Sequence, residues 1–166
     1  ASCDVCIDIG ANIGFYSCLA ASRQIPVVAV EPLPSNLQLL CRNVLENGFN
    51  HRVEIFPVGL GSHADLLKLF GADTGASFVS NWAGTANTLG HIVPVNTLDS
   101  LLNGRFADKR LLIKMDVEGF EYTALQGALA TLEREPRPMW LVEICLTENM
   151  PGGLNQRFAD TFELFW

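Results

Sequence analysis

The fold class of this chain is decided close to its start, by the sequence Val5-Cys6-Ile7-Asp8-Ile9-Gly10-Ala11-Asn12-Ile13-Gly14. The run from Val5 to Ile9 is almost continuously apolar, which is typical of a strand buried on both faces of a parallel sheet. The run breaks at Gly10, and a helix is expected from about Ile13 to Arg23. This unit predicts an α/β protein whose ligand site lies at the carboxyl ends of the strands.

The rest of the chain continues the alternation of apolar strand runs and periodic helix runs. Further strands are expected at 27–30, 53–58, 111–116 and 140–144, and further helices at 35–47, 98–102 and 122–134. Ser35 and Gln38 form a capping-box pattern at the start of the second helix. A last amphipathic piece covers residues 154–166.

Residues 62–96 do not continue this alternation. They hold short strand pieces at 66–70, 76–79 and 91–95, around a stretch rich in Gly, Ala, Thr and Asn. Long irregular segments inside a compact domain are often functional. We therefore expect an irregular β or flap insertion at about 62–96, within a single domain that covers residues 1–166.

The composition narrows the class of protein and its partners. The chain has 166 residues, 49% hydrophobic and 17% charged, so it can bury a core and is not a disordered chain. Its apolar runs are far shorter than the roughly 18–20 residues of a membrane span. The net charge is −7 and the basic residues are scattered, so we expect neither nucleic acid nor an anionic membrane as a partner. A small neutral or cationic ligand is compatible with this charge.

The five cysteines favour a structural interpretation. Cys3 and Cys6 have the spacing of a redox or zinc motif, but no second pair and no histidine at ligand spacing accompanies them. Free cysteines are usually small buried hydrophobes, and the reducing cytoplasm is their natural compartment. We therefore expect no metal site and a cytoplasmic protein.

The loop that follows the first strand restricts the ligand. Gly10 and Gly14 let the backbone turn tightly and let a ligand approach closely. Glu31, at the end of the second strand, can bind both hydroxyls of a ribose. A dinucleotide fingerprint has a glycine where this chain has Asn12, which disfavours a pyrophosphate ligand. A P-loop sequence is absent from the chain.

A second group of charged residues lies in Ile113-Lys114-Met115-Asp116-Val117-Glu118-Gly119-Phe120-Glu121. Charges at the end of a buried strand are costly unless they face a site or pair with one another. The Asp-x-Gly-x-Asn-x-Gly loop is similar to the first motif of class I S-adenosylmethionine-dependent methyltransferases. Together with Val30-Glu31-Pro32, Thr97-Leu98-Asp99 and Gly127-Ala128, the string Lys-x-Asp-x-Glu-Gly-x-Glu resembles the FkbM-type methyltransferase family over about residues 5–143.

This resemblance implies a fold and an activity. The fold would be a Rossmann-like three-layer sandwich with an open, mostly parallel sheet in strand order 3-2-1-4-5. The cofactor would be S-adenosyl-L-methionine, and the activity (EC 2.1.1.-) would be O-methylation of a hydroxyl on a small metabolite or sugar. Two alternatives stay open, a nucleotide-binding oxidoreductase of Rossmann type and a non-catalytic cofactor-binding module.

The resemblance also assigns the site. Glu31 would bind the ribose hydroxyls, and Asp116 would face the methyl group and the acceptor. A hydroxyl acceptor benefits from a base, for which Asp116 is the first candidate, Glu143 the second and His91 the third. The whole set of cofactor-binding residues would be Asp8, Gly10, Ala11, Asn12, Gly14, Glu31, Pro32, Val58, Gly59 and Asp116.

The charged neighbours of Asp116 have more than one interpretation. In the first interpretation, these neighbours orient Asp116 and build the acceptor side; they are Lys114, Glu118 and Glu121. In the second, Lys114 forms an ion pair with one of the acids, and the two glutamates are salt-bridge partners or carboxylates at a helix start. Asp116, Glu118 and Glu143 could also gather a divalent cation, because such ions prefer carboxylate oxygens. Nothing in the spacing demands a metal.

The end of the sequence bears on the sheet edge. Class I methyltransferases usually add an antiparallel pair of strands after the fifth strand, and this sequence stops before such a pair. We therefore expect strands six and seven to be missing and the outer edge of the fifth strand to be bare. A bare edge invites strand pairing. The chain is then either a piece of a longer enzyme or a homo-oligomer that covers this edge.

Overall fold

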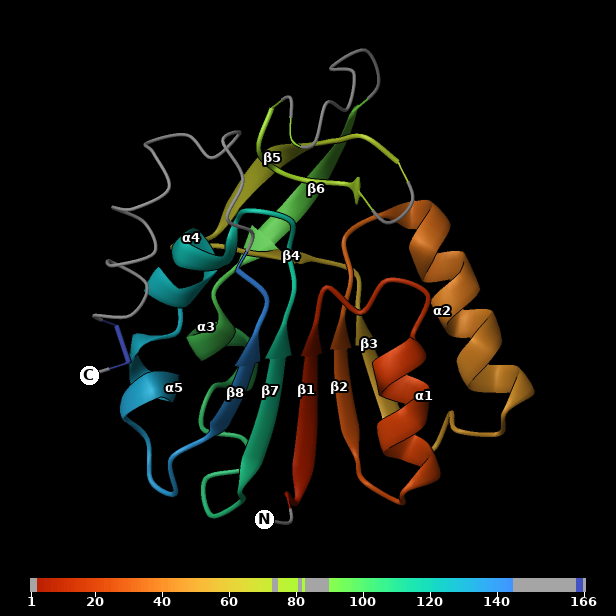
Figure 1. Ribbon diagram of the computed structural model, residues 1–166, viewed down its shortest axis with the longest axis vertical. Helices are drawn as coiled ribbons and strands as arrows, with labels where there is room; N and C mark the ends of the chain where they lie inside the picture. Colours follow the sequence, from red (N-terminus) through yellow and green to blue (C-terminus); the bar gives the residue numbers. More distant parts are fainter. Residues whose placement is uncertain (1–2, 73–74, 81, 83–89, 145–163, 166) are drawn as a thin grey trace.

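The computed structural model describes residues 3–72, 75–80, 82, 90–144 and 164–165 (Figure 1). Among these residues, five strands form a parallel sheet in the order β3-β2-β1-β7-β8, beside a smaller sheet in the order β4-β6-β5. The main strands are β1 (Val5–Ile9), β2 (Val27–Val30), β3 (Val53–Phe56), β7 (Leu111–Met115) and β8 (Met139–Val142). The predicted order 3-2-1-4-5 is confirmed, because β7 and β8 are the fourth and fifth parallel strands.

Helices cover both faces of the main sheet, as a three-layer α/β sandwich requires. The helices are α1 (Phe15–Ser22), α2 (Pro34–Glu46), α3 (Leu98–Leu102), α4 (Glu121–Gln126) and α5 (Leu129–Glu133). One core cluster joins strand residues to side chains of α3 and α4, and the other joins strand residues to α1 and α2. Alternate residues of a strand point to opposite faces, so Ile7 packs in the first cluster and Cys6 in the second.

The strand register also places two charges side by side. Asp8 and Lys114 are direct neighbours in β1 and β7, and each lies between apolar residues that face the α3–α4 layer. Their side chains therefore share the opposite face of the sheet. The register thus brings a buried acid and a buried base together in the middle of the sheet.

The insertion forms the smaller sheet. β5 (Asp65–Phe70) pairs antiparallel with β6 (Gly90–Asn96), and β4 (Gly59–Leu60) pairs parallel with β6. The strand pieces predicted at 66–70 and 91–95 are thus confirmed. The piece predicted at 76–79 is not a strand, since only the bridge between Phe70 and Ser77 forms there. The third strand ends at Phe56 rather than Val58, because Gly59 leaves to pair with β6.

Two helix predictions were wrong. The helix expected at 122–134 is divided into α4 and α5, which meet at Gly127-Ala128. A Cβ on Gly127 would lie 2.0 Å from the Gly61 carbonyl oxygen, so the backbones of the helix layer and the small sheet approach closely there. The capping box at Ser35 does not form, because α2 begins one residue earlier at Pro34, with Leu33 as its N-cap. Proline is well suited to a first helical position.

Two predictions at the end of the chain are not tested. The amphipathic piece at 154–166 lies almost wholly outside the described residues, as does the region after β8 where further strands would follow. Within the described ranges β8 pairs with β7 alone. Self-association through the edge of β8 stays a prediction.

The side chain of Asp99 links α3 to α5 through hydrogen bonds. Its carboxylate accepts the Ala130 N–H at 2.9 Å, the Thr131 N–H at 2.8 Å and the Thr131 hydroxyl at 2.7 Å. These bonds satisfy the first amides of α5, which have no partner within that helix. The motif residue Asp99 therefore has a structural role here.

We expect Asp99→Ala to lower the free energy of unfolding by about 1–2 kcal/mol, the usual cost of removing a helix cap. Urea denaturation measures this loss. Asp108→Ala removes an exposed aspartate and is the matched control, with no expected change in stability. Equal midpoints for the two variants would contradict the capping role.

Candidate active site

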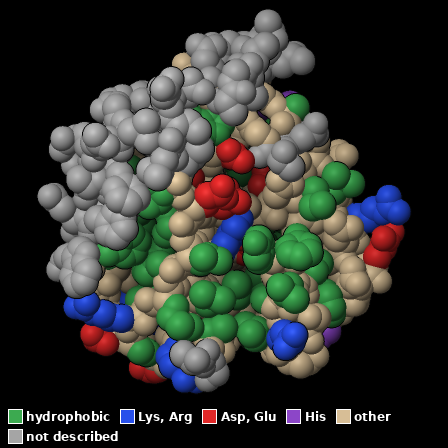
Figure 2. Space-filling model, in the orientation of Figure 1, with side chains coloured by type: hydrophobic (Ala, Val, Ile, Leu, Met, Phe, Trp, Pro, Cys, Tyr) green, Lys and Arg blue, Asp and Glu red, His purple; other side chains and the backbone are tan. Residues whose placement is uncertain are grey.

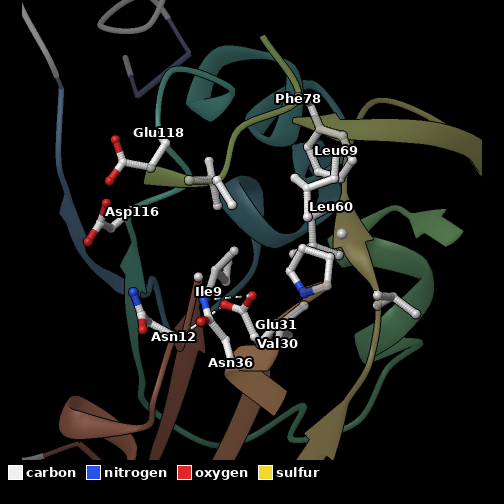
Figure 3. Close-up of a pocket in the computed structure, with 16 residues that line it drawn as sticks. Ile9, Asn12, Val30, Glu31, Asn36, Leu60, Leu69, Phe78, Asp116 and Glu118 are labelled. Atoms are coloured by element: carbon white, nitrogen blue, oxygen red, sulfur yellow. Dashed lines mark hydrogen bonds between the residues drawn. The ribbon is translucent and has the colours of Figure 1, made fainter. Parts of the chain in front are cut away.

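A cavity of about 220 Å³ opens at the carboxyl ends of β1, β2 and β7 (Figure 3). Leu60, Leu69 and Phe78 line one side of the cavity, while Asp116 and Glu118 lie on the opposite side (Figure 3). The complete lining consists of Ile9, Gly10, Asn12, Val30, Glu31, Pro32, Asn36, Val58, Gly59, Leu60, Leu69, Ala76, Phe78, Asp116, Val117 and Glu118. An apolar wall facing a polar wall suits a ligand with a flat apolar part and a charged part.

The glycine loop is held close to the end of β7. Gly10 and Asn12 have left-handed backbones, with φ of 71° and 53°. A Cβ on Gly10 would lie 1.8 Å from the Asp116 carbonyl oxygen, so only glycine fits there. Gly14, also left-handed, packs against Leu40 of α2.

Every amide of the loop from Gly10 to Gly14 already has an acceptor. The N–H groups of residues 10 and 11 bond to the Val30 carbonyl, and the Gly14 N–H bonds to the Ala11 carbonyl. The Asn12 N–H donates to Glu31 at 2.9 Å, and the Ile13 N–H donates to the Asn12 side-chain oxygen at 2.7 Å. A pyrophosphate would need such amides free, so this loop does not suit a dinucleotide.

Glu31 connects the loop to the start of α2. One carboxylate oxygen accepts the Asn12 N–H, and the other accepts the Leu33 N–H at 2.9 Å and the Asn36 side-chain amide at 3.5 Å. Burial raises the pKa of the Glu31 carboxyl. The residue lines the cavity and is held rigidly there, as the binding of two ribose hydroxyls would require.

Lys114 lies between two acids. Its ammonium donates to the Gly10 carbonyl at 2.8 Å and lies 3.6 Å from Asp8 Oδ1 and 3.4 Å from Asp116 Oδ2. Asp8 is completely buried, and its other oxygen accepts the Ser17 hydroxyl at 2.6 Å. Lys114 therefore forms an ion pair, with Asp8 and Asp116 as its acids, and it also ties the glycine loop to Asp116. Asp8 itself does not line the cavity.

The turn after β7 is held in place by hydrogen bonds and packing contacts from residues of the insertion. Glu118 has a left-handed backbone with φ of 53°. Its carboxylate accepts the Trp82 indole N–H at 2.7 Å, and its carbonyl accepts the Ser77 hydroxyl at 2.6 Å. The face of the buried Trp82 ring packs on Gly119, where a Cβ would lie 2.3 Å away. Sequence reasoning missed Trp82 and Ser77, because the stretch around them has no periodicity that predicts burial.

Glu121 is the helix-start carboxylate that one interpretation predicted. It lies in the first turn of α4, and its Oε1 accepts the Val117 and Gly119 N–H groups at 3.1 and 3.2 Å. Burial is the main cause that raises its pKa. Glu121 shapes the turn that carries Glu118 and does not line the cavity.

This raised pKa predicts a pH dependence. Folding disfavours ionised Glu121, so its contribution to stability is complete below its usual pKa of 4.5 and is lost as the pH rises through the raised value. Glu121→Gln keeps the acceptor oxygen without the charge. We expect its stability in urea, relative to the wild type, to rise from acidic to neutral pH. The exposed Glu133→Gln is the control, and a relative fall for Glu121→Gln would contradict the assignment.

The candidate bases differ in their location. Asp116 lines the cavity, and its charge is the main cause that raises the pKa of the Glu143 carboxyl just after β8, so these two acids lie together. Figure 2 shows acidic side chains gathered next to a basic one near the strand ends. His91 is exposed on β6 and lies outside the cavity lining.

The predicted cofactor residues fall into two groups. Asp8, Ala11 and Gly14 do not line the cavity, since Asp8 and Ala11 are buried and Gly14 packs on α2. The other seven line it, namely Gly10, Asn12, Glu31, Pro32, Val58, Gly59 and Asp116. Their roles toward a ligand stay predictions.

Among the described residues, no group of three or more His, Cys, Asp or Glu side chains could hold a metal ion. In the same part of the chain, no helix is long and apolar enough to cross a membrane. Cys6 is buried in β1, and burial raises the pKa of its thiol to about 12, which agrees with a structural role.

The strand order and the loop-to-strand geometry define a Rossmann-like methyltransferase fold. The chain belongs to the FkbM methyltransferase family, since the family model for the methyltransferase FkbM domain matches residues 8–163. A crystal structure of methyltransferase FkbM from Methylobacillus flagellatus KT shares the fold, with a TM-score of 0.53 and 23% identity. The match covers 81% of this chain and 31% of that protein. No curated protein matches the chain.

Proposed function

We propose that this methyltransferase domain binds S-adenosyl-L-methionine and methylates a hydroxyl of a small metabolite or sugar, as an EC 2.1.1.- enzyme. The observation that carries the proposal is the cavity beside a glycine loop whose amides are all engaged. Such a loop suits a nucleoside without phosphates, and the neighbouring Glu31 suits a ribose. The apolar side formed by Leu60, Leu69 and Phe78 suits an adenine.

When bound, the cofactor would supply an electrophilic methyl group on a sulfonium. The leaving group is already good, so alignment supplies much of the rate. Gly10 and Asn12 would border the amino-acid part, and Glu31 would fix the ribose. Lys114, whose ammonium lies 3.4 Å from Asp116 Oδ2, would orient Asp116 beside the acceptor.

The carboxyl groups of Asp116 and Glu143, at the ends of β7 and β8, would remove the proton from the acceptor hydroxyl. Asp116 has a cationic neighbour in Lys114, whereas the charge of Asp116 raises the pKa of Glu143. Two neighbouring acids whose environments differ are typical of sites where protons are exchanged. We propose Asp116 as the base and Glu143 as the group that shares the proton.

Calorimetric titration tests the proposal. We expect S-adenosylhomocysteine to bind and NAD⁺ to give no heat. Binding of NAD⁺ alone would overturn the proposal in favour of an oxidoreductase.

For the reaction, transfer of labelled methyl to a panel of hydroxylated metabolites and sugars is the assay. Loss of turnover by about 10²–10⁴-fold in Asp116→Asn is the expected size for a general base. Unchanged turnover would remove Asp116 from the mechanism.

A further inference from the structure

Because Asp8 is buried, the residue that would bind the ammonium group of the cofactor has to be found elsewhere. A nucleoside with an amino-acid tail carries an ammonium group, and Asp8 is an acid that the family resemblance places in the set of cofactor-binding residues. In the structure, Asp8 is completely buried, engages Ser17 and Lys114, and does not line the cavity. The Gly10 carbonyl, another acceptor near the loop, already receives the Lys114 ammonium. A carboxylate that lines the cavity would be a stronger acceptor for the ammonium group than a carbonyl that already holds Lys114.

Glu118 is the acid of the cavity best prepared for this role. Its side chain lines the cavity beside Asp116 and opposite Phe78 and Leu69 (Figure 3). The Trp82 indole occupies Oε2, which leaves Oε1 to receive a ligand. Asp116 already has Lys114 at 3.4 Å, and Glu31 has the ribose as its partner in the proposed function.

The insertion holds Glu118 in place from three directions. The Trp82 N–H fixes the carboxylate, the Ser77 hydroxyl fixes the carbonyl, and the Trp82 ring covers Gly119. A left-handed backbone at a glutamate is uncommon and persists only where its surroundings impose it. These contacts orient one carboxylate oxygen before any ligand arrives, and such preorganisation lowers the cost of binding.

We propose that Glu118 binds the ammonium group of the cofactor's amino-acid tail and that Trp82 is the positioning residue that orients it. The inference rests on the proposed function and goes further, because it assigns the ammonium group of the tail to the segment after β7 and to the insertion. It also gives the insertion a second role, in addition to the apolar side of the cavity that Leu69 and Phe78 form.

Two probes and three variants test the inference by calorimetry. S-adenosylhomocysteine has the tail, whereas 5′-methylthioadenosine has the same nucleoside and thioether without it. Glu118→Gln should weaken S-adenosylhomocysteine by about 10-fold or more, as loss of a charged hydrogen bond does, and leave 5′-methylthioadenosine unchanged. Trp82→Phe keeps a ring over Gly119 without the N–H, and should weaken the first probe alone by about 3- to 10-fold. Glu46→Gln, on the exposed end of α2, should change neither.

The outcomes separate the inference from the proposed function. If neither probe binds the wild type, the proposed function fails and the inference with it. If both probes bind, and Glu118→Gln weakens them equally or not at all, the inference alone is overturned. Nuclear magnetic resonance of the indole N–H gives a second readout that needs no ligand. The Trp82 signal should shift in Glu118→Gln and stay unchanged in Glu46→Gln. Should Glu118→Gln not fold, the selective loss in Trp82→Phe decides alone.

Discussion

Replacing Lys114 with methionine should lower the free energy of unfolding by about 3–5 kcal/mol, because removal of one partner leaves a buried charge uncompensated. Asp8 is completely buried, and Lys114, only 7% exposed, is the cation beside it. The substitution also removes the donor to the Gly10 carbonyl. Urea denaturation at neutral pH measures the loss.

A double-mutant cycle separates the pair from the packing of the side chains. Asp8→Asn in the Lys114→Met background removes the unpaired charge and should recover much of the lost stability. Lys109→Met, at an exposed lysine of the loop before β7, is the matched control and should stay close to the wild type. A loss below about 1 kcal/mol in Lys114→Met would contradict the buried ion pair, since that is the size expected of a surface pair.

Gly10→Ala should both destabilise the protein and abolish binding of S-adenosylhomocysteine. The added Cβ would lie 1.8 Å from the Asp116 carbonyl oxygen, and backbone must move to accept it. We expect a loss of about 2–5 kcal/mol from the left-handed backbone and the clash together. Thermal unfolding and calorimetric titration measure the two effects.

Gly48 provides a matched control for Gly10. Both glycines have a φ of 71°, but a Cβ on Gly48 would meet nothing within 4 Å. Gly48→Ala therefore carries the backbone strain alone, about 1–2 kcal/mol, and should leave ligand binding intact. If both variants lose equal stability and both still bind, the close approach of the loop to β7 does not matter for the site.

The sequence predicted the main sheet well, because its strands are short apolar runs with clear ends. β1 and β2 have the predicted bounds, and the strand order is the one that the family resemblance implied. The helix at 122–134 could not be predicted as two pieces. Its break depends on the contact between Gly127 and Gly61, which lies in another part of the chain. Tertiary contacts of this kind override helical periodicity.

The residues of the candidate site could be predicted from the sequence, but the groups that these residues contact could not. Gly10, Glu31 and Asp116 could be found because they follow predicted strands, whose carboxyl ends share one edge of the sheet. The partner of Lys114 depends on the register of β1 and β7, and that of Glu118 on a tryptophan in an irregular segment. Neither is encoded in local spacing.

The position of β1 in the middle of the sheet has a consequence for the order of folding. Its neighbour β7 comes late in the chain, and Asp4 and Arg110, which bond beside these strands, are 106 residues apart. Closing so long a loop costs entropy before any contact repays it, so such pairings form slowly. We expect β1, β2 and β3 to assemble first, with one edge of β1 still in water. Asp8 would then stay hydrated until β7 arrives, and the strand that buries this acid is the one that brings its counter-ion.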